Sequence, residues 1–573
     1  MPRGMPGSRN PIRLVLSTHR VGVLKKGLTF MTSSTSVLAG KFPRFVDVPD
    51  HFRLEAPLHQ RHILIGGELR QWKGQTRTVH SPIYVRADDG ALEPVEVGSY
   101  PVTTEKESLE ALHAAVTAFD SGAGRWPTMS VDERIAHVED FTRRIVQQRQ
   151  EIIRLIMWEI GKSAADSAKE FDRTIDYIRQ TVDALKELDN GNSRFQVVEG
   201  TIAQIRRAPL GVVLCMGPYN YPLNETFTTL IPALIMGNVI LFKPPKFGTL
   251  LFAPLLDAFR QAFPPGVVNT VYGRGEEVVP PLMASGDVHV LALIGSSRVA
   301  DKLKKLHPKS NRLRAVLGLD AKNAAIILPD ADLDLAVKEC VLGSLSFNGQ
   351  RCTALKAILV HEAIADVFLE KFSAAIAALH VGMPWEDGVF VTPLPDPGKP
   401  DYLSACLEDA KQKGATVRNL GGGESCQSLF VPAVVYPVSK EMRLYREEQF
   451  GPVVPVVPFA DIREALEYVE SSDYGQQVSI FGSNPDTIAT LVDPLVNQVC
   501  RVNINCQCQR GPDVFPFTGR KDSAKGTLSV ADALRAFSIR TMVAARATDA
   551  SKALLNDIVL GHRSSFISTR FVF

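Results

Sequence analysis

The chain has 573 residues, of which 45% are apolar and 22% charged, as in ordinary globular proteins with more than one domain. A net charge of +2 gives no strong attraction to nucleic acid or to a membrane surface, and no apolar run reaches the roughly 20 residues of a membrane span. The 8 cysteines show no disulfide framework and the 12 histidines no metal-ligand spacing, so we expect a reducing compartment and no metal site.

Residues 1–46 differ from the rest of the chain, because they carry scattered lysines and arginines and no acidic residue precedes Asp47. This composition is typical of a mitochondrial or plastid transit peptide. A disordered extension, or a chain that starts at Met31, explains it as well. We therefore expect residues 1–50 to lie outside the fold, and a cytoplasmic protein with an organelle as the alternative.

From about Arg61 the pattern is globular. Residues 62–68 predict an edge hairpin, and a capping box at Ser130 opens a helix that Gly161 closes. A second helix is expected over residues 164–188, and a strand pair over 195–208.

Short apolar strands then alternate with helices from Gly211 to His307, which predicts a doubly wound parallel sheet. Ligands of such sheets lie at the carboxyl ends of the strands. A second alternating series runs from Leu319 to about Val499. Residues 500–573 read as strands, including 564–567 and 571–573.

Cys352 lies between Arg351 and Thr353, and residues 354–360 after it read as a buried strand. An adjacent guanidinium favours the thiolate form that a nucleophile needs. The alternative is a buried cysteine that acts as a small apolar residue.

The stretch Phe347–Lys356 resembles the active-site stretch of the aldehyde dehydrogenase superfamily. The resemblance is to its non-phosphorylating glyceraldehyde-3-phosphate dehydrogenase branch, in which an arginine precedes the catalytic cysteine. It extends from about Arg61 to Val543. The other motifs that carry it, in the family's order, are residues 217–222, 242–245, 272–275, 295–297, 447–452 and 506–517.

The resemblance implies an α/β fold of three parts and a homodimer or homotetramer. A doubly wound parallel sheet binds the cofactor, a second α/β domain holds the nucleophile, and a small β domain serves oligomerisation. The expected boundaries are 51–194 and 209–318 for the cofactor domain, 319–499 for the catalytic domain, and 195–208 and 500–573 for the oligomerisation strands and C-terminal tail.

The resemblance also implies the chemistry. The Cys352 thiolate attacks an aldehyde, the Asn220 side chain and the cysteine N–H hold the oxyanion, hydride passes to nicotinamide, and water hydrolyses the thioester. The alternative for Asn220 is a turn residue before Pro222.

For the cofactor we expect NADP. Lys243 ends a strand, and Lys246 stands where NAD-preferring members carry a glutamate, so a second ammonium is placed to attract a 2′-phosphate. Two solvated lysines are the alternative, and Ala300 replaces a glycine of the family's pattern. The further cofactor residues that the resemblance implies are Tyr219, Gly273, Gly275, Gly295, Ser296, Leu319, Glu448 and Phe450.

The substrate phosphate of that branch is held by three arginines and a tyrosine. The matching residues here are Arg173, Tyr221, Arg351 and Arg510, with Thr353 beside them. Guanidinium forks suit phosphate, although each arginine alone could be structural. We therefore expect oxidation of glyceraldehyde 3-phosphate to 3-phosphoglycerate without inorganic phosphate.

One position departs from the family, because Gly318 replaces the glutamate that activates the hydrolytic water. Loss of such a base commonly costs on the order of 10²–10⁴ in rate. Asp320 is the first candidate substitute, since residues i and i+2 of an extended segment share a side. Alternatively Glu448 swings in, coenzyme A accepts the acyl group from this or another aldehyde, or the chain is a catalytically weak cofactor-binding protein.

Overall fold

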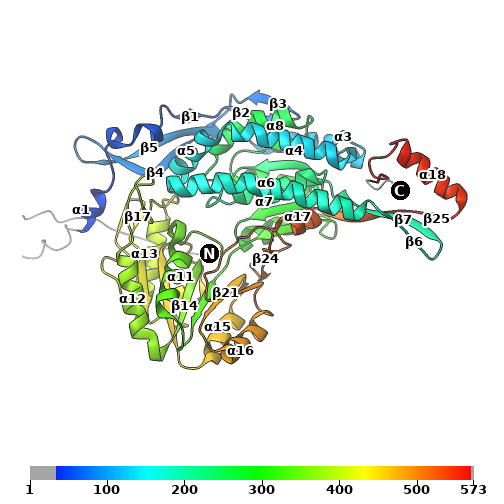
Figure 1. Ribbon diagram of the computed structural model, residues 1–573. Coiled ribbons are helices and arrows are strands. Elements are labelled where there is room, and N and C mark those ends of the chain that lie inside the picture. Colours follow the sequence, from blue (N-terminus) through cyan, green and yellow to red (C-terminus); the bar gives the residue numbers. More distant parts are fainter. Residues whose placement is uncertain (1–33, 570–573) are drawn as a thin grey trace, which may run out of the picture.

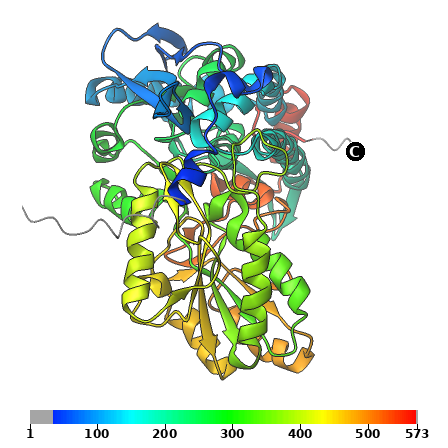
Figure 2. The same ribbon diagram turned by 90° about the vertical axis from the view of Figure 1, so that its left-hand side faces the viewer.

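The computed structural model describes residues 34–569, arranged as an upper and a lower part (Figures 1 and 2). Most of the transit-peptide-like stretch falls on residues 1–33, outside the described range. Residues 34–50 do not form the extension that we expected: α1 (Ser34–Ala39) is followed by Phe42 and Val48, which are fully buried in the core. The fold therefore begins before residue 50. Within residues 34–569 no helix is both long and apolar enough to cross a membrane.

The predicted doubly wound sheet is confirmed. The sheet order is β10-β9-β8-β11-β12-β24, parallel except at the edge strand β24 (Ala524–Lys525). The other strands are β8 (Val212–Met216), β9 (Val239–Lys243), β10 (Val268–Thr270), β11 (Val290–Ile294) and β12 (Arg314–Gly318). The connecting helices are α7 (Asn224–Ile235), η4 (Leu250–Leu255), α8 (Leu256–Ala262), α9 (Gly275–Ser285) and α10 (Ser297–Leu306). Chain order reverses between β8 and β11, where such sheets bind ligands.

The second alternating series forms a seven-stranded sheet of order β15-β18-β19-β14-β13-β21-β22. Its strands are β13 (Asn323–Ile327), β14 (Leu355–His361), β15 (Thr416–Val417), β18 (Ala433–Tyr436), β19 (Val453–Phe459), β21 (Gln477–Phe481) and β22 (Arg501–Ile504). Its helices are α11 (Leu333–Leu345), α12 (Ala365–Ala377), α13 (Lys399–Gln412), α14 (Arg443–Arg446), α15 (Ile462–Ser471) and α16 (Pro485–Leu495). Two short pairs accompany it, β16 (Ser425–Cys426) with β17 (Leu429–Phe430) and β20 (Tyr474–Gly475) with β23 (Arg520–Lys521). Cys352 lies in the loop between α11 and β14.

A third sheet extends from one end of the long helix α6 (Ala164–Asn192) (Figure 1). It has the order β25-β7-β6, with β6 (Phe195–Val198), β7 (Thr201–Pro209) and β25 (Ser538–Arg546). The expected hairpin over residues 195–208 is confirmed. The division of the chain into functional domains stays a prediction.

We expected residues 500–573 to form strands, and the structure corrects this. Besides β22 to β25 they form α17 (Val530–Ala536), which packs on α6 and α7, and α18 (Asp549–Leu560). The Thr548 side chain caps α18, and strong helix formers follow. Residues 564–567 are not a strand; carbonyls of Ser565 and Phe566 accept hydrogen bonds from Arg206 on β7. Residues 571–573 lie outside the described range.

The N-terminal region confirms the hairpin β2 (His62–Ile65) and β3 (Glu68–Gln71). Elements that we did not expect are β1 (Leu58–His59), β4 (Thr76–Arg86), β5 (Leu92–Pro101), α2 (Glu105–Phe119) and α3 (Arg125–Thr128). The capping box at Ser130 forms, and Gly161 ends the helical region at a φ of 67°. The single helix expected between them is two, α4 (Val131–Val146) and α5 (Arg149–Ile160).

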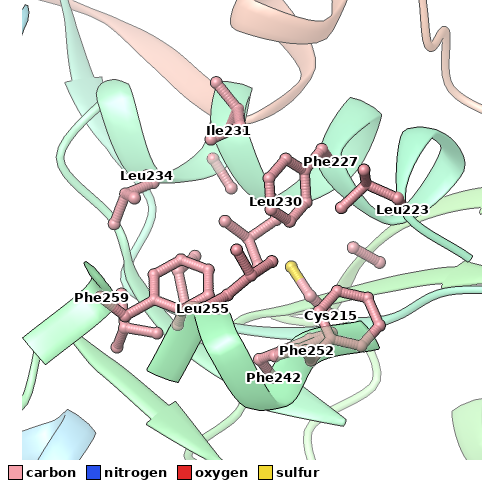
Figure 3. Close-up of a cluster of buried hydrophobic side chains, with 14 of the residues drawn as sticks. Cys215, Leu223, Phe227, Leu230, Ile231, Leu234, Phe242, Phe252, Leu255 and Phe259 are labelled. Carbon is pink, nitrogen blue, oxygen red and sulfur yellow. The ribbon is translucent and has the colours of Figure 1, made fainter. Parts of the chain in front are cut away.

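Helix α7 is fixed by an apolar cluster against β8 and β9 (Figure 3). Leu223 and the α7 side chains Phe227, Leu230 and Leu234 pack among Phe242, Phe252, Leu255 and Phe259, and all are buried. The polar first turn of α7, Asn224 and Glu225, is buried as well. The core therefore holds this turn rigidly beside the segment that carries Asn220.

Candidate active site

A cavity of about 1080 Å³ collects most of the predicted site residues. It lies where residues after β8, β11 and β12 face the loop before β14. Its lining includes Arg173, Tyr219, Asn220, Tyr221, Gly295, Ser296, Leu319, Asp320, Arg351, Cys352, Thr353, Glu448, Phe450 and Arg510. Lys243, Lys246, Gly273 and Gly275 do not line it.

The loop before Cys352 turns sharply through three left-handed residues. Phe347, Asn348 and Gly349 have φ angles of 47°, 56° and 69°. The Asn348 amide fixes the turn, because it donates to the Thr392 carbonyl (3.0 Å) and accepts from the Thr392 N–H (3.0 Å). A Cβ on Gly349 would lie 2.6 Å from the Ser344 oxygen, so only glycine fits. Such strain is maintained where the surroundings enforce it.

Burial raises the pKa of the Cys352 thiol. The carboxylate of Glu225 raises that pKa further, whereas the cations of Lys356 and Arg510 lower it. Arg351, the neighbour that we expected to favour the thiolate, instead donates to the carbonyls of Leu342 (3.1 Å) and Gly343 (2.9 Å). The cations beside the thiol therefore come from more distant positions in the sequence.

Asn220 lies directly beside the nucleophile loop. Its Nδ2 donates to the Gln350 carbonyl at 2.7 Å, and its own carbonyl accepts from Lys162 Nζ at 2.7 Å. Lys162 forms a fully buried ion pair with Glu170, which also accepts from the N–H groups of Leu223 and Asn224. An amide nitrogen has two protons, and the hydrogen bond to the Gln350 carbonyl uses one of them.

The three predicted phosphate-binding arginines line the cavity, but all have protein partners. Arg173 forms a bidentate pair with Asp513 (2.9 and 2.7 Å). Arg510 pairs with Glu225 and Asp513 and donates to the Leu528 carbonyl at 3.1 Å. The two carboxylates offset the charge of two guanidinium groups.

The same cavity is also lined by Tyr221, Thr353 and Arg351. The Tyr221 ring lies 3.5 Å from Lys162 Nζ, a cation–π contact, and Thr353 is buried. Arg351 Nε is buried and has no hydrogen-bond partner within the described residues.

Glu448 forms a buried ion pair with Lys356 and accepts from the Ala321 N–H at 3.2 Å. Burial raises the pKa of Glu448, and the Lys356 cation lowers it. Phe450 lies against Tyr219 with the ring centroids 5.9 Å apart. Tyr219 also donates to Gln350 Oε1 at 3.3 Å, which ties this wall to the nucleophile loop.

Asp320, the expected substitute base, lines the cavity but faces another partner. Its Oδ2 accepts from the N–H (2.7 Å) and hydroxyl (2.8 Å) of Ser297, at the start of α10. A Cβ on Gly318 would lie 3.3 Å from Leu528 Cδ1 and 3.5 Å from Ile294 Cγ1. Apolar side chains therefore flank the position where the family carries its glutamate.

Comparisons with known proteins agree with this arrangement. The model of the "Aldehyde dehydrogenase family" matches residues 91–543. The chain belongs to the aldehyde dehydrogenase family. The predicted membership and the predicted class of enzyme are thereby confirmed.

Individual relatives carry a more specific name. An NADP-dependent glyceraldehyde-3-phosphate dehydrogenase of Streptococcus equinus is 34% identical over 79% of this chain and 93% of its own length. One of Nicotiana plumbaginifolia is 31% identical over 75% of this chain and 86% of its own. The crystal structure of such an enzyme from Bacillus halodurans C-125, complexed with NADP, is 30% identical with a TM-score of 0.78, covering 86% of this chain and 100% of that one.

The remaining cofactor residues predicted from the family do not line this cavity. Lys243, at the end of β9, donates to the Pro244 carbonyl (3.0 Å), and burial lowers its pKa to about 8. Gly275 opens α9 beside it, and a Cβ there would lie 3.5 Å from Lys243 Cε. Gly273, with a φ of 101°, has no room for a side chain because a Cβ would lie 2.7 Å from the Thr103 oxygen. Lys246 is exposed at a separate cavity of about 240 Å³.

Sequence reasoning missed five residues of the site: Lys162, Glu170, Glu225, Lys356 and Asp513. Lys356 and Asp513 stand inside motifs quoted above, whereas nothing near Glu225 in the sequence indicates that it reaches Cys352. Within residues 34–569 no group of three or more histidine, cysteine, aspartate or glutamate side chains is placed to hold a metal ion.

Proposed function

We propose that this chain oxidises glyceraldehyde 3-phosphate to 3-phosphoglycerate with NADP and without inorganic phosphate. The observation that carries the proposal is the convergence of Cys352, Asn220 and three arginines on one cavity. Relatives at 31–34% identity that are named NADP-dependent glyceraldehyde-3-phosphate dehydrogenase support it.

In this mechanism the Cys352 thiolate bonds to the aldehyde carbon, and the carbonyl oxygen becomes an oxyanion. The free N–H of Asn220 Nδ2 and the cysteine's backbone N–H donate to that oxyanion, a contribution that commonly amounts to a few kcal/mol. Bound NADP supplies the acceptor for the hydride that leaves this carbon. A thioester on Cys352 results, and water converts it to the carboxylic acid.

The residues around the switch point between β8 and β11 fit a dinucleotide. Lys243 is a half-buried ammonium with no carboxylate within salt-bridge distance among residues 34–569, which suits an anionic group. Gly275 and Ser296 stand at the starts of α9 and α10, where backbone N–H groups favour phosphate. Glu448 and Phe450 would border the nicotinamide side, and Lys246 stays the predicted second cation for the 2′-phosphate.

The substrate phosphate would meet Arg173, Arg351 and Arg510. Arg351 brings a buried Nε that has no hydrogen-bond partner among residues 34–569. Because Asp513 and Glu225 offset the other two cations, we expect weaker phosphate binding than an unpaired arginine cluster would give.

Gly318 favours a second candidate function, transfer of the acyl group from Cys352 to coenzyme A. A cavity wall without a base at this position leaves the thioester for a stronger nucleophile than water. The two functions differ in one requirement, since only the second needs an added thiol.

We further propose a homodimer or homotetramer built on the β25-β7-β6 sheet. Val198 and Met542 on one face of this sheet, and Val197 on the other face, are 60–64% exposed, and these apolar side chains are ones that a second copy would cover.

Rapid mixing of the purified chain with glyceraldehyde 3-phosphate and excess NADP tests the proposal, with no phosphate or coenzyme A present. Sustained NADPH formation supports hydrolysis. One NADPH per site followed by a stall that coenzyme A relieves supports the second candidate. If no NADPH forms, both candidates fail for this aldehyde.

A further inference from the structure

The start of α10 already holds a negatively charged group of the chain itself. Asp320 Oδ2 accepts hydrogen bonds from the Ser297 N–H at 2.7 Å and from the Ser297 hydroxyl at 2.8 Å. Helix α10 has no acidic residue in its own first turn. The carboxylate therefore comes from another part of the fold, the segment that follows β12, and two hydrogen bonds fix it to the helix.

Asp320 and the start of α10 border the cavity that also contains Cys352. Gly295, Ser296, Arg298 and Asp320 all line it. These residues follow the carboxyl ends of β11 and β12, the edge of a parallel sheet at which dinucleotides bind. Phosphate groups bound at such an edge lie at the starts of the helices that follow the strands. The Asp320 carboxylate therefore lies where the pyrophosphate of NADP would approach the helix.

The acidic residues at the start of the neighbouring helix α9 are arranged differently. Glu276 and Glu277 lie 3.6 and 3.3 Å from nitrogens of Arg274, which offsets their charge, and neither lines the cavity. Asp320 has no lysine or arginine within salt-bridge distance among residues 34–569, and Ser297 is its hydrogen-bond partner. Its charge is therefore not neutralised by an ion pair.

The bound carboxylate changes the sign of the charge at the start of α10. Aligned peptide groups give a helix start about half a positive charge, and the full negative charge of Asp320 outweighs it. Two N–H groups of the first turn are also already used, since that of Ser297 donates to Asp320 and that of Val299 donates to the Ser296 carbonyl at 3.1 Å. This helix start therefore attracts a phosphate less than one without a bound carboxylate.

We propose that Asp320 sets the affinity for NADP by weakening its binding, because its carboxylate holds the position at α10 that suits the cofactor's pyrophosphate. The proposal rests on the proposed function only in that NADP is the cofactor, and it involves no step of the oxidation. The same repulsion acts on NADPH, whose pyrophosphate is identical, so Asp320 also favours release of the reduced cofactor. A residue that we first expected to act as the hydrolytic base thus acts on the cofactor instead.

Dissociation constants for NADP and NADPH, measured by calorimetry on the purified chain without aldehyde, test the proposal. Asp320→Asn removes the charge but keeps an oxygen that can accept from Ser297. We expect this variant to bind both forms of the cofactor more tightly than the wild type, on the order of three- to tenfold, with a difference that shrinks at high salt. If Asp320→Asn does not fold, Asp320→Ala, which also removes the charge, takes its place.

Asp332→Asn is the matched control for the loss of a carboxylate at a helix start. Asp332 caps α11 through the N–H groups of Asp334 (3.0 Å) and Leu335 (3.1 Å), but it does not line the cavity. We therefore expect this variant to bind NADP with the wild-type dissociation constant.

A second probe identifies the part of the cofactor on which Asp320 acts. Adenosine 2′-monophosphate carries the 2′-phosphate of NADP but no pyrophosphate, so Asp320→Asn should leave its dissociation constant nearly unchanged. Unchanged or weaker NADP binding in Asp320→Asn would overturn the proposal, and so would an equal gain for both ligands. If the wild-type chain and the variant both fail to bind NADP, the proposal fails together with the cofactor. Failure of glyceraldehyde 3-phosphate as a substrate leaves all of these outcomes unaffected.

Discussion

Lys356 Nζ joins the nucleophile to the opposite wall of the cavity: it pairs with the Glu448 carboxylate and donates to the Cys352 carbonyl at 3.3 Å. It is also the cation that most lowers the pKa of Cys352, while Glu225 raises that pKa. The reactivity of the thiol is thus set by opposing charges on two different elements.

Substitution of Lys356 and substitution of Glu225 should shift the pKa of the Cys352 thiol in opposite directions. Lys356→Met removes a cation that stabilises the thiolate, so the pKa of Cys352 rises and alkylation by iodoacetamide reaches half its maximal rate at a higher pH. Glu225→Gln removes an anion, so that midpoint falls. The pH profile of alkylation measures both, and shifts of the same sign would contradict the charge assignment.

The buried pair of Lys162 and Glu170 should be important for stability. Lys162→Met leaves Glu170 buried without its cation, and we expect a loss of about 3–5 kcal/mol in the free energy of unfolding by urea. The double variant with Glu170→Gln should recover part of it. Lys304→Met, at the exposed surface pair with Asp301, is the control and should leave the free energy of unfolding nearly unchanged.

Because Asp513 pairs with Arg173 and Arg510, we expect removal of its carboxylate to improve the use of a phosphorylated substrate. Asp513→Asn releases Arg173 and Arg510 from an anionic partner. The kcat/KM for glyceraldehyde 3-phosphate should rise several-fold relative to that for unphosphorylated glyceraldehyde. Arg173→Ala should lower the same ratio. Equal effects on the two aldehydes would show that Arg173 and Arg510 do not bind the substrate phosphate.

Lys243 at the end of β9 and Lys246 after it predict different cofactor effects. Lys246→Glu should shift preference from NADP toward NAD, because a carboxylate repels the 2′-phosphate. Lys243→Met should weaken NADP binding more than NAD binding, as its half-buried ammonium is free of carboxylates in the described range. Dissociation constants from fluorescence titration measure both, and an unchanged preference in Lys246→Glu would remove Lys246 from that site.

Cys352→Ser should abolish oxidation and leave the NADP dissociation constant nearly unchanged. The serine hydroxyl is a far weaker nucleophile at neutral pH, while no cofactor contact is lost. Measurable turnover in this variant, checked by single-turnover NADPH absorbance, would place the chemistry elsewhere.

The sequence predicted what is encoded locally or in contiguous motifs. The parallel sheet followed from strand and helix alternation, and Cys352 and Asn220 from motifs in which every position is close in the chain. Glu225 was missed because its contact with Arg510 spans 285 residues and depends on how α7 meets the loop after β22. Asp320 was predicted as the substitute base from strand geometry. In the folded chain its carboxylate instead accepts hydrogen bonds from Ser297 at the start of α10, a contact that the sequence does not indicate.

The anchoring of the nucleophile loop has an evolutionary consequence. Asn348 contacts the main chain of Thr392 at 3.0 Å in both directions, and its Nδ2 also donates to the Thr392 hydroxyl at 3.3 Å. The two shorter bonds do not depend on the side chain at residue 392, whereas residue 348 must keep both an amide and a left-handed backbone. Among descendants of this chain, selection should therefore be stronger at residue 348 than at residue 392.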